Sequence, residues 1–202
     1  MNQLLRRACG MAMTVAAVVL VNASSALACA CCSETAWRYV ETEGLKPRHT
    51  AEIDQLRFAK AAKLMAGMRE EDKRIRGVKD AGENYELAVS RPKDGMAFSF
   101  KDEKGRTGTL AFPLPIIISI FEVDPRGAET DKGLGPSLYK EWKLTAHATG
   151  DGLFKAAVNR NTKVTLVLHG RGNACTSADQ FSDWTLLVYG PRGKFTLYGK
   201  LD

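Results

Sequence analysis

Large apolar side chains alternate with polar or small ones along most of the chain after residue 84. The clearest stretches are residues 85–89, 96–100, 142–146 and 164–168. Successive side chains of a strand point to opposite faces, whereas a helix would distribute them around its axis. The pattern therefore predicts strands with one face on a core and the other near solvent.

Turn-forming sequences separate these stretches at short intervals, for example at residues 91–95, 150–152 and 190–193. Proline and glycine favour tight turns, and strands joined by such turns pair antiparallel. The clearest hairpin joins residues 184–189 to 195–201. We predict a mainly β fold, an antiparallel β-sandwich or barrel of about eight strands with one short N-terminal helix.

We expect the helix within residues 50–75, where alanines and lysines at 59–63 favour helical structure. Leu56 and Phe58 could equally begin a strand, which is the alternative for this segment. His49 lies just before it in a turn-like segment, which is typical of plain surface. The apolar run at residues 110–121 contains Pro113 and Pro115 and is shorter than the roughly 20 residues that cross a bilayer. We therefore predict a buried strand entered through an irregular proline-rich bend, and no transmembrane span in the mature chain.

The first 28 residues have the features of a secretory signal peptide. Arg6 and Arg7 precede an uncharged apolar stretch, and Ala26-Leu27-Ala28 matches the small-x-small cleavage pattern. We therefore predict a signal peptide over residues 1–28 and a single β-rich exported domain over residues 29–202, located in the periplasm or secreted. Cys29 would be the first mature residue. Because Ala26 stands where lipoprotein signals usually have leucine, a lipid anchor at Cys29 is only the alternative.

The charge balance argues against a nucleic-acid partner. Without the signal, 27 basic residues exceed the 23 acidic ones by four, and the two signs are interspersed. Nucleic-acid binding favours a concentrated basic patch with aromatic residues to stack on the bases. We expect no nucleic-acid partner.

Four cysteines remain after cleavage, and an oxidising compartment favours disulfides. Cys31 and Cys32 are adjacent and pair poorly with each other, so we predict that one of them bridges to Cys175. Closing a loop of this length stabilises a fold by roughly 4–5 kcal/mol.

A metal site is the alternative for the same sulfur atoms. Cys29, Cys31 and Cys32 lie within four residues, and thiolates suit copper or zinc. Cys175 and His169 would complete the ligand set. The spacing differs from that of a zinc ribbon, and free thiolates oxidise outside the cytoplasm, so we rank this second and otherwise expect no cofactor.

A Cys/His enzyme acting on the cell wall ranks last. His169-Gly170 followed by Cys175 resembles the L,D-transpeptidases, exported β-rich enzymes that crosslink peptidoglycan. Those enzymes have a Ser-x-Gly-Cys segment followed by Arg, whereas here Asn173-Ala174 precede the cysteine and the next arginine is Arg192. We do not transfer the activity.

No catalytic arrangement reaches useful specificity, so we predict a non-enzymatic envelope or extracellular protein that binds an unidentified partner or ligand. Tyr189 and Tyr198 alternate with the expected core positions Trp184 and Phe195, and exposed together they would form an apolar binding patch. The Gly-containing loop at residues 126–137 is the other candidate surface.

Overall fold

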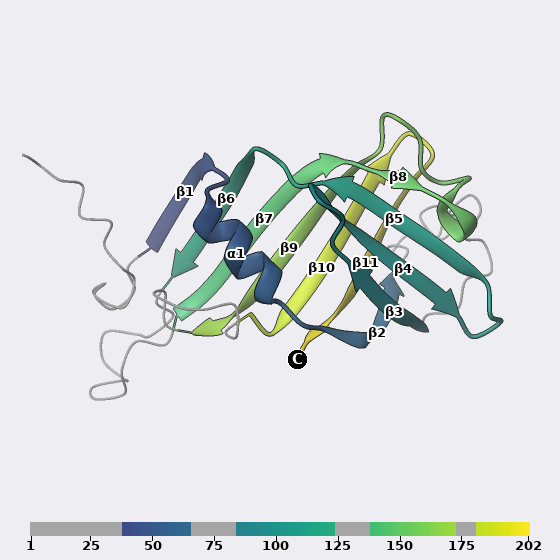
Figure 1. Ribbon diagram of the computed structural model, residues 1–202, viewed down its shortest axis with the longest axis horizontal. Coiled ribbons are helices and arrows are strands. Elements are labelled where there is room, and N and C mark those ends of the chain that lie inside the picture. Colours follow the sequence, from purple (N-terminus) through teal and green to yellow (C-terminus); the bar gives the residue numbers. More distant parts are fainter. Residues whose placement is uncertain (1–37, 66–83, 124–137, 173–180) are drawn as a thin grey trace, which may run out of the picture.

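The computed structural model describes residues 38–65, 84–123, 138–172 and 181–202. Within them it has eleven strands and one α-helix (Figure 1). The strands are β1 (Arg38–Gly44), β2 (Phe58–Met65), β3 (Asn84–Ser90), β4 (Gly95–Asp102), β5 (Thr107–Pro113), β6 (Ile117–Val123), β7 (Leu138–His147), β8 (Thr149–Gly150), β9 (Lys163–Gly172), β10 (Asp183–Gly190) and β11 (Gly193–Leu201), and the helix is α1 (Pro47–Gln55).

All eleven strands belong to one open antiparallel sheet, in the order β1-β6-β7-β9-β10-β11-β2-β3-β4-β5-β8. The prediction of a mainly β, antiparallel fold with one short helix is confirmed. The prediction of about eight strands in a sandwich or barrel is wrong. Each strand expected after residue 84 is present. Strands β1 and β8 were not predicted, and β2 forms where a strand was only the alternative to the expected helix.

The sheet is continuous because β2 pairs with strands on both sides. It pairs with β11 along one edge and with β3 along the other. We call strands β1, β6, β7, β9, β10 and β11 the first arm of the sheet, and β2, β3, β4, β5 and β8 the second arm. In a sandwich, no hydrogen bonds would join the strands of one sheet to those of the other. Here β2 is hydrogen-bonded to both arms, so they form one sheet.

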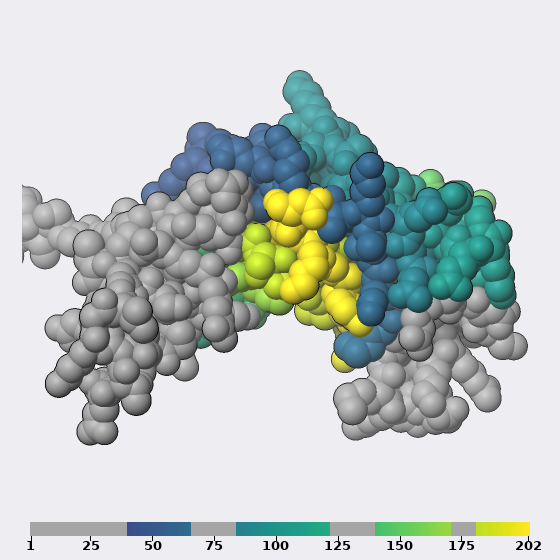
Figure 2. Space-filling model, turned by 90° about the horizontal axis from the view of Figure 1, so that it is seen from below, coloured from purple at the N-terminus to yellow at the C-terminus, as the bar shows by residue number. Residues whose placement is uncertain are grey.

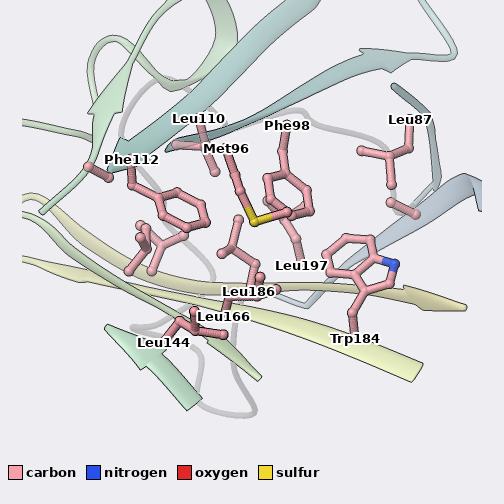
Figure 3. Packing of buried hydrophobic residues seen from close by; sticks show 14 of the residues in the cluster. Leu87, Met96, Phe98, Leu110, Phe112, Leu144, Leu166, Trp184, Leu186 and Leu197 are labelled. Atoms are coloured by element: carbon pink, nitrogen blue, oxygen red, sulfur yellow. The ribbon is translucent and has the colours of Figure 1, made fainter. Parts of the chain in front are cut away.

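The two arms face each other across one hydrophobic core (Figure 3). Phe98 of β4 is fully buried, and its ring centroid lies 5.4 Å from that of Trp184 on β10. Phe58 of β2 contacts both rings, at 5.3 Å from Phe98 and 5.9 Å from Trp184. Aromatic side chains from both arms therefore meet at the strand that connects them.

The indole of Trp184 lies beside Gly199 of β11, the residue paired with it across the hairpin. A Cβ atom at residue 199 would lie 2.8 Å from the Trp184 Nε1 atom and 2.8 Å from the backbone oxygen of Ala61. Glycine at this position therefore allows the core indole to pack directly against the β11 and β2 backbones.

The helix is shorter and begins earlier than the sequence pattern predicts. Pro47 lies in its first turn, a position where the missing N–H costs nothing. The alanine-rich stretch at residues 59–63 is part of strand β2 instead. Its pairing with β11 and β3 satisfies the backbone there, so tertiary contacts override the local helical preference of alanine.

Three other predictions concern segments outside the described residues. They are the signal peptide, the N-terminal cysteines, and the loop at 126–137. Among the described residues, no helix has the length and apolar character needed to cross a bilayer.

Candidate functional site

Tyr189 and Tyr198, the predicted binding residues, lie on the same face of the first arm. Trp184, Leu186 and Val188 of β10 point into the core, so Thr185, Leu187 and Tyr189 point to the opposite, outer face. The β10–β11 register pairs Thr185 with Tyr198 and Leu187 with Thr196. Directly paired residues share a face, so Tyr198 also points outward.

Two further apolar side chains lie between and beside the tyrosines. A row here is a line of directly paired residues that runs across neighbouring strands. Leu187 pairs with Thr196 in the row between the two tyrosines. Met65 of β2 pairs with Thr196 from the other side and so lies in the same row. The exposed fractions are 65% for Tyr189, 40% for Tyr198, 42% for Leu187 and 49% for Met65. We call these four residues the outer patch. They supply apolar area that the core does not use.

A groove of about 480 Å³ borders the outer patch at Tyr198. Its lining combines small side chains of β2, such as Ala59 and Ala61, with polar groups of Lys63 and Asn84. In the view of Figure 2, the yellow C-terminal strands lie in the middle of the molecule with the blue β2 segment beside them. The groove therefore lies where β2 meets β11.

His169 of β9 lies in the row of outward positions at one end of this face. It pairs with Glu141 of β7 on one side and Asp183 of β10 on the other. Each carboxylate has a lysine partner, with Lys143 Nζ 2.8 Å from Glu141 Oε1 and Lys200 Nζ 2.5 Å from Asp183 Oδ1. Partial burial alone would raise the pKa of Asp183, but hydrogen bonds from Lys200 and Ser182 lower it below its usual value.

The predicted disulfide and the alternative metal site are not visible in the described part of the chain. Cys29, Cys31, Cys32 and Cys175 all lie outside it. His169 is the one residue of the alternative ligand set that is described, and no group of three or more His, Cys, Asp or Glu residues suited to a metal occurs among the described residues.

A buried polar cluster beneath α1 was not expected from the sequence. Lys140 of β7 is only 1% exposed, and its Nζ lies 2.6 Å from Glu52 Oε1 on the helix. The ammonium also lies 4.7 Å from the ring centroid of Trp142 and 4.2 Å from that of Phe181. Cation–π attraction and the carboxylate together hold this charge in the interior.

His49 belongs to the same cluster, and its expected place on the surface is wrong. Its side chain is buried, and its ring contacts Trp142 edge-on at 5.2 Å. The Nδ1 atom accepts a hydrogen bond from the backbone N–H of Lys46 at 3.1 Å. The Nε2 atom accepts a hydrogen bond from Arg48 Nε at 3.2 Å and lies 3.1 Å from Glu43 Oε1. His49 thus orders the start of α1.

The arrangement of α1 over the inner face of the first arm follows from these contacts (Figure 1). Isolated lysine, glutamate and histidine residues give no sequence signal that would bring them together. The alternation of Lys140 with Glu141 and of Trp142 with Lys143 does place Lys140 and Trp142 on one face. A lysine on the same face as a tryptophan expected in the core is the sequence signal that could have indicated a buried charge at this position.

Comparisons with known proteins do not identify the chain: no family model, no curated protein and no solved structure matches it. The outer patch, the adjoining groove and the row containing His169 are therefore interpreted from their own chemistry.

The buried pair of Lys140 and Glu52 is expected to stabilise the attachment of α1. Glu52→Gln removes the carboxylate charge beside the buried Lys140 ammonium and should lower the free energy of unfolding by roughly 3 kcal/mol. The control is Glu86→Gln, which breaks the exposed Lys101–Glu86 pair and should cost less than about 1 kcal/mol. Urea unfolding measures both, and equal effects would contradict the role of the buried pair.

His49 is expected to make stability depend on pH. Burial lowers the pKa of His49, and the Glu43 carboxylate counters only part of that effect. The unfolded chain takes up a proton as pH falls through about 6.5, while the native ring stays neutral to lower pH. Stability attributable to His49 is therefore present at higher pH and falls by up to about 1.4 kcal/mol per pH unit below about 6.5.

Urea unfolding at pH 7.5 and 5.5 measures this dependence. His49→Gln should be less stable at pH 7.5 but lose less stability at pH 5.5 than the parent protein. His147→Gln is the matched control because His147 is exposed on β7. An unchanged pH dependence in His49→Gln would show that this residue is not responsible.

Proposed function

We propose that the protein is an exported, non-enzymatic binding protein of the cell envelope or extracellular space. The observation that carries this proposal is the outer patch, in which two tyrosines, a leucine and a methionine are exposed together on adjacent rows. Contiguous apolar side chains on an otherwise polar surface mark sites of interaction. The groove beside Tyr198 extends the same surface with polar groups.

The export part of the proposal rests on the first 28 residues, whose basic, apolar and small-residue regions match a secretory signal. A bridge from Cys31 or Cys32 to Cys175 fits an oxidising compartment. Residue 175 belongs to the connection between β9 and β10, which are interior strands of the first arm. Such a bridge would attach the N-terminal segment to the most extensively paired part of the sheet.

The surroundings of His169 support a binding role over catalysis by a Cys/His pair. Both carboxylates beside His169 are engaged by lysines, Glu141 by Lys143 and Asp183 by Lys200. A catalytic histidine usually has a partner that orients it toward a nucleophile. Here the described neighbours form a network of surface ion pairs.

Photo-crosslinking in cells tests the binding face. A photoreactive phenylalanine analogue at position 189 or 198 should give a discrete adduct, because both side chains are exposed in the outer patch. The control position is residue 116, where Ile116 is 85% exposed but outside the outer patch. Equal adducts at all three positions, or none at 189 and 198, would refute the proposal.

A copper or zinc site remains the second candidate, favoured by one observation. His169 is only partly buried and lies on the strand that leads to the segment containing Cys175. Together with Cys29, Cys31 and Cys32 these residues offer ligands suited to either metal.

Thiol counting separates the two sulfur chemistries. If the disulfide is correct, protein purified after export should begin at Cys29 and expose no alkylatable thiol until it is reduced. Adding a chelator should change nothing. Thiols that become reactive with chelator alone would establish the metal site and overturn the bridge. Mass spectrometry reads out the N-terminus, any lipid on Cys29 and the alkylated cysteines together.

A further inference from the structure

Three lysines lie next to the outer patch, and none has a carboxylate partner among the residues that the structure describes. Lys163 of β9 and Lys194 of β11 pair with Tyr189 from either side, and Lys63 of β2 pairs with Tyr198. We call Lys63, Lys163 and Lys194 the patch lysines. All three are exposed, and the structure shows no ion pair for them within the described part of the chain.

The acidic groups on this face do not offset the patch lysines. Glu141 and Asp183 lie in the row of His169, and each is already paired with another lysine. The row with Leu187 contains Thr165, Thr196 and Met65, which carry no charge. The outer patch is therefore apolar at its centre, with excess positive charge along both ends.

This composition differs from that expected of a protein–protein interface. The centres of such interfaces are depleted in lysine, because a strongly hydrated ammonium is costly to bury. Lys163 and Lys194 lie directly opposite Tyr189, with Cβ atoms of paired residues about 5 Å apart. A protein covering Tyr189 would have to bury or neutralise both ammonium groups.

An anionic bilayer surface accommodates the same arrangement without that cost. Tyrosine favours the boundary between acyl chains and headgroups, where the ring is apolar and the hydroxyl stays hydrated. Lysine stems extend along apolar surface while their charges reach the phosphates. Leu187 and Met65 would enter the acyl boundary between them. Stable attachment generally needs two signals, and apolar area plus cationic charge supplies both.

We propose that the outer patch and the patch lysines bind the surface of a bilayer containing anionic phospholipids. This inference rests on the proposed function, since it names the partner of the same face. Binding is reversible and electrostatically assisted. It depends on the side chains of β2, β9, β10 and β11 and is separate from any lipid attached at the N-terminus.

Vesicle co-sedimentation tests this assignment. The complete chain is expressed, and the protein recovered from the soluble fraction is mixed with vesicles of phosphatidylcholine alone or of equal parts phosphatidylcholine and phosphatidylglycerol. Binding is expected only to the anionic vesicles and should weaken as salt is added. Each lysine near a charged membrane contributes about fivefold in affinity. Lys163→Gln/Lys194→Gln should therefore reduce binding about thirtyfold.

Two further variants make the test specific to this face. Leu187→Ser/Tyr189→Ser keeps every charge and should weaken binding about tenfold by removing apolar contact. Lys93→Gln/Lys104→Gln removes the same number of charges from the exposed β3–β4 and β4–β5 turns and should bind like the parent. Circular dichroism and urea unfolding check that the variants fold.

Absence of binding to anionic vesicles, or equal loss in the turn control and the patch variants, would overturn the lipid assignment. If that happens while photo-crosslinking at position 189 still yields a discrete protein adduct, the proposed binding function stands with a protein partner. If both experiments fail, the binding function fails as well.

Discussion

Strand β2 is the element on which the rest of the structure depends. Its hydrogen bonds to β11 and β3 turn two opposing arms into one sheet. Phe58, at the start of β2, contacts core rings of both arms, and Ala62 is buried beside Tyr85 and Gly199. Small residues at these positions bring the backbones together, while the large rings of Phe98 and Trp184 fill the space between the arms.

The outward side chains are then set by register. Once Trp184, Leu186 and Val188 point into the core, Leu187 and Tyr189 must point away from it. Pairing with β11 and β2 brings Tyr198 and Met65 onto the same surface. Folding does not require these four positions to be apolar, because the core is complete without them. Their composition is therefore informative about binding.

Much of the fold could be predicted from alternation and turn chemistry, because each strand from β3 onward, apart from the two-residue β8, combines buried and outward positions in sequence. The hairpin and the shared outward face of Tyr189 and Tyr198 follow from the same pattern. Strand β2 could be predicted only as an alternative to a helix, since its alanines and lysines favour helix locally and pairing with distant strands makes them extended. The cluster of Lys140, Glu52 and His49 depends on where α1 packs, which no local pattern encodes.

The residues that stabilise the fold and those proposed to bind a partner lie on opposite faces of the first arm. The Lys140–Glu52 pair and His49 act between α1 and the inner face of the first arm, whereas the outer patch lies on the opposite side of the same strands. Replacing Leu187 or Tyr189 removes exposed apolar area and leaves the buried contacts of Trp184 and Leu186 in place. Surface substitutions of this kind usually change stability by no more than about 0.5 kcal/mol. Loss of binding in an outer-patch variant can therefore be attributed to the surface itself.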